Sequence, residues 1–79
     1  MLIPSKHDHP DQTVLSVSSI LLRQLRRQRI APYADLVKIA KRKVKGGEVL
    51  FVPAINLLYA LGLVEYRRKV DSFEYVGPR

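Results

Sequence analysis

The stretch VLFVPAINLLYALGLV, from Val49 to Val64, has 16 residues and no charged side chain. A helix needs about 20 mainly apolar residues to cross a bilayer. This stretch is shorter and also contains Pro53, Asn56 and Gly62, so we expect no membrane span. A chain of 79 residues has room for one domain. The stretch therefore predicts either the core of that domain or a surface on which another molecule docks.

The rest of the chain is basic. It has 14 Lys and Arg against 7 Asp and Glu, which gives a net charge of +7. Excess positive charge favours a polyanionic partner such as nucleic acid, an acidic protein surface or a membrane surface. The chain has no cysteine, which excludes disulfides and thiolate metal sites. No signal peptide is visible at the N-terminus, and we expect a cytoplasmic protein.

Residues 1–13 are predicted to be an N-terminal arm, and residues 14–79 a single domain. Pro4 and Pro10 prevent a continuous helix in the arm. The first helix is predicted from Val14 to Arg29, with Thr13 as its cap. Its buried side is indicated by apolar residues at helical spacing, namely Val14, Val17, Leu21 and Leu25.

The sequence IAPYADLVKIAKRKVKGG predicts a second helix that has Pro32 in its first turn. Its apolar stripe consists of Tyr33, Leu36, Val37, Ala40 and Val44. A basic stripe follows the same spacing at Lys38, Lys41, Arg42 and Lys45. Gly46 and Gly47 are expected to end this helix.

A short strand at Gly47–Leu50 is predicted next, followed by a third helix at Phe51–Leu61 that ends at Gly62. The core side of that helix is predicted to be Phe51, Ala54, Ile55, Leu58 and Leu61. Two segments rich in Val, Tyr and Phe, Leu63–Arg67 and Phe73–Val76, predict a β-hairpin. The resulting fold class is α+β and mainly α: a winged helix-turn-helix of three helices and a C-terminal hairpin wing, preceded by the arm.

The outward side of the third helix carries Val52, Asn56 and Tyr59 at i, i+4 and i+7. In a helix-turn-helix DNA reader this side enters the major groove, where Arg, Lys, Asn, Gln and acidic side chains read bases. Here it offers one Asn and no charge. It therefore favours a protein contact, in which aromatic side chains often anchor the interface. The alternative is that Tyr59 only covers the wing.

Candidate nucleic-acid-binding residues lie elsewhere, in three groups: the end of the first helix, the basic stripe of the second, and the wing tip. They are Arg26, Arg27, Lys38, Lys41, Arg42, Lys45, Arg67, Arg68 and Lys69. If these groups converge, they can bind phosphates without reading sequence. Each group alone also fits an ordinary solvated surface, because cations near a helix C-terminus interact favourably with its dipole.

No arrangement of residues predicts catalysis. Ser16, Ser18 and Ser19 have no histidine nearby in the sequence, and Gly46-Gly47 is no phosphate-binding loop. We expect no enzyme and no cofactor. The segment KHDHPD contains His7 and His9 with two aspartates, but it lacks the preset ligand spacing of a metal site. No metal is therefore expected.

Three segments resemble a known family. They are IPSKH (Ile3–His7), PDQTVLSV (Pro10–Val17) and NLLYALGLVEY (Asn56–Tyr66), and together they span nearly the whole chain. They are similar to the middle component proteins of bacterial ABC-three-component systems. The resemblance implies an anti-phage defence system of the Lamassu kind, in which the small subunit is encoded beside an SMC/Rad50-like ATPase and an effector, often a nuclease.

The role implied by the resemblance is a non-enzymatic adaptor bound to the coiled-coil ATPase. Lys6 and His7 are the motif residues carried over, and the apolar Leu2 and Ile3 complete the arm as a docking segment. The third helix, with Val52, Asn56 and Tyr59, is the second predicted partner surface. A further contact with the backbone of double-stranded DNA is left open. Two alternatives remain: a free-standing winged-helix transcriptional regulator, and a small homodimer.

Overall fold

The computed structural model describes residues 13–78, and its first helix begins where the sequence predicts. Helix α1 (Val14–Gln28) is capped by Thr13, whose side chain accepts a 3.1 Å hydrogen bond from the Ser16 N–H. It ends at Gln28, one residue before the predicted end, and the C-cap residue Arg29 has a φ of 76°, in the left-handed region. The Arg29 N–H still donates to the Leu25 carbonyl at 2.7 Å, after which the chain turns into a strand.

That strand, β1 (Ile30–Pro32), corrects the predicted order of elements, because the short strand was expected after the second helix. β1 pairs antiparallel with β3 (Ser72–Tyr75), which also pairs antiparallel with β2 (Val64–Arg67), so the sheet order is β1-β3-β2. Ala31 lies opposite Phe73 in the register and is fully buried. With α2 (Tyr33–Lys43) and α3 (Gly47–Ala60), the order is that of a winged-helix fold, α+β and mainly α, as predicted.

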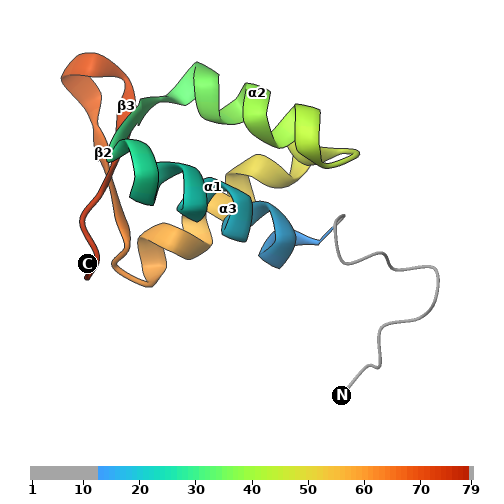
Figure 1. Ribbon diagram of the computed structural model, residues 1–79, viewed down its shortest axis with the longest axis horizontal. Coiled ribbons are helices and arrows are strands. Elements are labelled where there is room, and N and C mark those ends of the chain that lie inside the picture. The colour runs from blue at the N-terminus through green and yellow to red at the C-terminus, as the bar shows by residue number, and fades with distance from the viewer. Residues whose placement is uncertain (1–12, 79) are drawn as a thin grey trace.

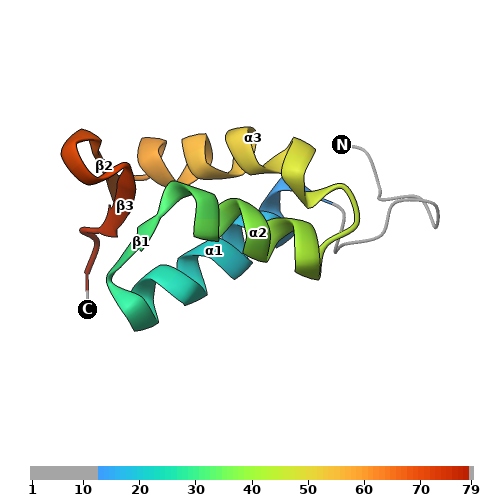
Figure 2. The same ribbon diagram turned by 90° about the horizontal axis from the view of Figure 1, so that it is seen from above.

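The three helices pack against one another, and the sheet closes one end of the bundle (Figures 1 and 2). In both views α1 and α3 run in the same direction and α2 runs in the opposite direction. The shared core includes Leu21 and Leu25 of α1, Leu36 of α2 and Phe51 of α3, all buried. Ser18 is also buried, and its hydroxyl lies 2.7 Å from the Val14 carbonyl and 3.3 Å from the Ala54 carbonyl of α3.

The predicted strand at Gly47–Leu50 is wrong, because these residues form the first turn of α3. Helix α2 ends at Lys43, before the two glycines. Gly46 has a φ of +77° and turns the chain into α3. A Cβ at Gly47 would lie 2.0 Å from the Ala40 carbonyl oxygen, so α3 starts directly against the backbone of α2. The turn of the helix-turn-helix is therefore formed by residues 44–46, and Gly47 begins α3 in close contact with α2.

The end of α3 follows the prediction for Gly62. This residue has a φ of +75°, and its N–H donates to the Tyr59 carbonyl while the Leu63 N–H donates to the Leu58 carbonyl. This pair of bonds is the Schellman motif. Leu61, predicted in the core, is instead 61% exposed, because the helix has already ended at Ala60. None of the helices within residues 13–78 has the length and hydropathy that a membrane crossing requires.

The hairpin is present as predicted, with strands β2 and β3 within one or two residues of the expected ends. A single 3-10 turn, Arg68–Val70, joins them and forms the wing tip. Asp71 follows with a φ of 46°, and the Tyr33 N–H donates to its carbonyl at 2.9 Å. Phe73 contacts Tyr33, Phe51 and Tyr66 with ring centroids 5.1–6.4 Å apart, so the wing is attached to the helices through aromatic packing.

Candidate functional site

The outer side of α3 is exposed and uncharged. Val49 is 74% exposed, Val52 51% and Tyr59 63%. We call this surface the outer strip and define it by residues at helical spacing, all exposed: Val49, Val52, Pro53, Asn56, Tyr59 and Ala60. The prediction that Val52, Asn56 and Tyr59 share an exposed side of the third helix is confirmed, while their role in partner binding stays a prediction.

The chemistry of the outer strip suits contact with another protein more than contact with DNA. Glu48, in the first turn, is the only charged residue in α3. Pro53 lies inside the helix and has no N–H to donate to the Val49 carbonyl four residues earlier. Asn56 and that carbonyl add polar groups to an otherwise apolar surface. An apolar patch with an aromatic residue and few polar groups is typical of the centre of a protein interface.

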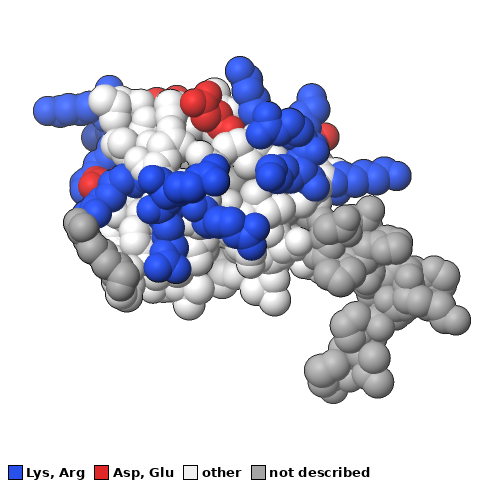
Figure 3. Space-filling view, viewed as in Figure 1, with Lys and Arg blue, Asp and Glu red and all other residues white. Residues whose placement is uncertain are grey.

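The basic residues gather on a different side of the molecule. In Figure 3, which faces α1, Lys and Arg side chains cover the end of α1 and much of α2. Figure 2 shows α1 and α3 on opposite sides of the bundle. Because the core lies between these helices, the outer strip and the basic surface of α1 face away from each other.

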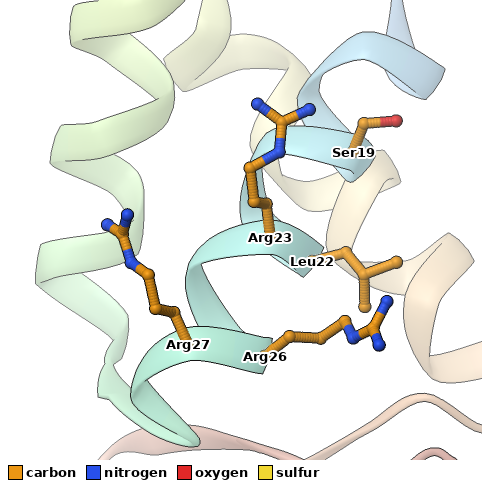
Figure 4. A pocket seen from close by; sticks show the side chains of 5 residues that line it. All are labelled: Ser19, Leu22, Arg23, Arg26 and Arg27. Atoms are coloured by element: carbon orange, nitrogen blue, oxygen red, sulfur yellow. The ribbon is translucent and has the colours of Figure 1, made fainter. Parts of the chain in front are cut away.

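The α1 part of this basic surface contains a hollow of about 550 Å³, which we call the arginine hollow. It is lined by five residues of α1: Ser19, Leu22, Arg23, Arg26 and Arg27. In Figure 4 the guanidinium groups of Arg23, Arg26 and Arg27 spread to different sides of α1. A second hollow of about 190 Å³ adjoins it and lies between α1 and α2. Arg23 and Arg27 line both hollows, and Lys43 of α2 lines the second.

Neighbouring side chains contact two of these arginines, Arg26 and Arg27. The Arg26 guanidinium lies 5.9 Å from the centre of the Tyr75 ring, a cation–π contact between α1 and β3. Arg27 Nη2 donates to Gln24 Oε1 at 3.1 Å, and Gln24 Nε2 donates to Gln28 Oε1 at 2.7 Å. These contacts restrict both side chains and keep their charged ends at the surface.

The predicted nucleic-acid residues separate into three groups in the structure. Arg26 and Arg27 line the arginine hollow. An exposed row lines neither hollow: Lys38, Lys41 and Arg42 of α2, and Lys45, which was predicted on this helix but lies in the turn after its end at Lys43. Arg68 and Lys69 are exposed at the wing tip, away from both hollows. The α1 group therefore meets α2 through Lys43, while the wing group stands apart.

Arg67 differs from the other predicted cations because two carboxylates hold it. Its Nε lies 2.7 Å from Glu74 Oε1, and its Nη1 lies 3.1 Å from Glu65 Oε1. The hydrogen bond and charge of Glu74, with a smaller effect of Glu65, raise the pKa of Arg67 above its ordinary value. Its charge is balanced within the wing, so it is a poor candidate for a phosphate contact.

Sequence reasoning left Arg23 and Lys43 out of the nucleic-acid set. Arg23 could have been found by extending the Arg26–Arg27 pair one helical turn upstream, at i−3 and i−4. Nothing in the sequence shows that Lys43 faces α1, because this depends on how α2 packs. Leu2, Ile3, Lys6 and His7 lie outside the described residues, as does the His7–His9 segment.

Comparison with known protein families gives a match over more than half of the chain. Residues 29–76 match the sequence model of the family described as "ABC-three component (ABC-3C) system Middle Component 8". No curated protein and no solved structure matches the chain. The matched region runs from the end of α1 to the end of the wing, and so includes the outer strip, Lys43 and the exposed row on α2.

Proposed function

The chain belongs to the ABC-3C system Middle Component 8 family, and on that premise we propose that it is a non-enzymatic adaptor subunit of a defence complex. Its partners are an ABC-type ATPase, which we expect to be SMC/Rad50-like as in Lamassu systems, and an effector subunit. The outer strip of α3 is the surface that docks on the ATPase. We place the complex in the cytoplasm.

One observation carries this proposal: the helix that a winged-helix DNA reader would insert into the major groove presents no basic side chain. Val52 and Tyr59 are more than half exposed there, although an isolated domain gains nothing from leaving a large aromatic side chain in water. Burying this ring against a partner would remove it from water, and aromatic residues in such positions are often binding hot spots.

The same observation weighs against the alternative, a free-standing transcriptional regulator. On the outer strip such a protein would have only Asn56 to read bases, since its neighbours there are Val52, Pro53 and Tyr59. Specific readers rely on bidentate contacts from Arg, Lys, Asn or Gln. The basic residues on the opposite side leave room for a second contact of the adaptor, with nucleic acid and without base recognition.

The test is to co-express the chain with the other components of its system and purify the complex through a tag on the ATPase. The variant Val52→Asp/Tyr59→Ala places a charge in the outer strip and removes its aromatic ring. We expect it to co-purify at less than about a tenth of the wild-type yield, because loss of a hot-spot residue costs at least about 2 kcal/mol, or roughly 30-fold in affinity.

Val70→Asp is the matched control, because Val70 is 61% exposed at the wing tip and lies outside the outer strip. It introduces the same charge at an equally accessible apolar position. We expect it to co-purify normally, and both variants to melt like the wild-type chain. Full recovery of the Val52/Tyr59 variant would contradict the assignment of this surface. Equal loss in both variants would show that the effect is not specific to α3.

A further inference from the structure

We infer that the arginine hollow and the adjoining Lys43 bind the phosphate backbone of a nucleic-acid duplex without reading its sequence. This binding site lies on α1 and the end of α2, not on α3, where a winged-helix protein usually contacts DNA. Its binding residues are Arg23, Arg26, Arg27 and Lys43. The inference concerns a surface that the docking of α3 does not use, and it stands without the proposed function.

The two hollows concentrate positive charge on one surface. Among residues 13–78, three guanidinium groups and one ammonium group line the two adjoining hollows, and no carboxylate of these residues lines either one. The ion pairs found within residues 13–78 join Arg67 to Glu65 and Glu74, on the wing. The cations of the hollows therefore keep their full charge for an external anion. Duplex DNA, with one negative charge per about 1.7 Å of axis, is an anion of matching charge density.

Favourable interaction with helix dipoles does not account for the whole group. Arg26 and Arg27 lie in the last turn of α1 and Lys43 in the last turn of α2, where cations are favoured. Arg23 lies before the last turn of α1, yet it lines both hollows. Because α2 runs back along α1, the end of α2 brings Lys43 beside the middle of α1. Two helices thus contribute cations to one surface.

Two of the arginines are preorganised for binding. The Tyr75 ring and the Gln24–Gln28 pair restrict Arg26 and Arg27 before any ligand arrives. Less side-chain entropy is then lost when they bind phosphate. The planar guanidinium group also suits phosphate, because it can donate two parallel hydrogen bonds to the phosphate oxygens.

The lining residues favour a duplex over a single strand. Proteins that bind single strands stack bases on exposed aromatic side chains. Within the described part of the chain no aromatic residue lines either hollow, and the Tyr75 ring beneath Arg26 is buried. An acidic polypeptide carries fewer charges per unit length than a duplex and would use this surface less fully. A lipid surface would need apolar side chains free to insert, but Leu22, Ile20 and Ile39 pack against the core.

The position of the site would allow the adaptor to bind two partners at once, an inference that rests on the proposed function. Because the arginine hollow and the outer strip face away from each other, a duplex on α1 would leave α3 free for the ATPase. The adaptor could then hold nucleic acid and its protein partner at the same time.

The test measures fluorescence anisotropy of labelled 20-base-pair duplexes of two unrelated sequences, titrated with the full-length chain between 50 and 200 mM NaCl. We expect both duplexes to bind equally, with affinity that falls steeply as salt rises. The variant Arg23→Gln/Arg26→Gln/Arg27→Gln should bind roughly 30-fold more weakly at 100 mM NaCl, and its salt slope should be shallower by about 2 to 3. Arg23→Gln alone should lower the slope by about 1.

The matched control, Lys38→Gln/Lys41→Gln/Arg42→Gln, removes the same number of charges from the α2 row that lines neither hollow. It should retain most of the affinity. Each of three results would overturn the inference. The wild-type chain does not bind the duplex at 50 mM NaCl, the α1 variant binds with wild-type affinity, or the control variant loses as much affinity as the α1 variant. Tighter binding of single-stranded DNA would also overturn the inference. Equal competition by polyglutamate at the same charge concentration would assign the surface to an acidic protein instead.

Discussion

Helices α1 and α3 share one core but differ completely on their outer sides. Both bury a row of large apolar residues, such as Leu21 in α1 and Phe51 in α3. Outside the core, α1 carries three arginines around a hollow, whereas α3 has no charged residue after Glu48. Two helices that both pack against the core can thus present surfaces for different partners. In this chain the usual recognition helix of a winged-helix fold is the one without a basic residue.

The largest expected effect on stability is a difference between substitutions on the inner and on the outer side of α3. Phe51 is 1% exposed and its neighbour Val52 is half exposed. Phe51→Ala should lower the free energy of unfolding by about 3–5 kcal/mol, because it removes a core ring and leaves a cavity. Val52→Ala should change it by less than about 0.5 kcal/mol. Urea denaturation of both variants measures the difference, and similar losses would show that the outer strip is part of the core.

The next effect tests the turn that places α3 against α2. Gly47→Ala should destabilise the domain by about 2–3 kcal/mol, because its Cβ would overlap the Ala40 backbone and force the helices apart. Gly46→Ala is the paired variant. Its Cβ would meet no atom within 4 Å, so only the strain of a positive φ remains, about 1–2 kcal/mol. Thermal denaturation should rank the two in this order, and the reverse order would contradict the close packing of α2 and α3.

The smallest effect is a pH dependence in the wing, away from both surfaces. The Tyr66 hydroxyl donates a hydrogen bond to the Asp71 carboxylate, which, together with partial loss of hydration, raises the pKa of Tyr66 above its ordinary value. The bond stabilises the fold fully below a pH of about 10, the unfolded pKa. This stability is lost as the pH rises through the higher folded pKa.

Tyr66→Phe should therefore make stability fall less steeply between pH 9 and 11, by a small margin since Tyr66 is exposed. Urea midpoints across this range measure it. Identical slopes for variant and wild type would show that the hydrogen bond is not maintained in solution. Duplex binding at pH 8 should be unchanged in this variant, because Tyr66 lines neither hollow.

The fold was largely predictable because its signals are local. Apolar spacing located the three helices, Thr13 marked the start of α1, and Gly62 marked the end of α3. β1 was missed because three residues are too few to show a period, and its pairing with β3 depends on residues 40 or more positions away. The segment at Gly47–Leu50 looked like a strand because its apolar residues are consecutive; only packing on Ala40 shows that a helix begins there.

The surfaces were predictable in part, for a related reason. Helical spacing alone places Val52, Asn56 and Tyr59 on one side of α3, and the structure agrees. Convergence of charges is a tertiary property. Lys43 reaches the α1 arginines only through the packing of α2, and Arg67 is held by Glu74 only because β2 pairs with β3. Sequence reasoning therefore could not distinguish cations that are available to a ligand from those that already form ion pairs within the domain.

The most direct test of the account compares the two surfaces in one experiment. The Val52→Asp/Tyr59→Ala and Arg23→Gln/Arg26→Gln/Arg27→Gln variants would be co-expressed with the tagged ATPase and its effector, and the amount of each variant in the purified complex measured. The account predicts that the α3 variant is lost from the complex and that the α1 variant remains at the wild-type amount. Retention of the α3 variant together with loss of the α1 variant would contradict it and place the protein contact on the basic side.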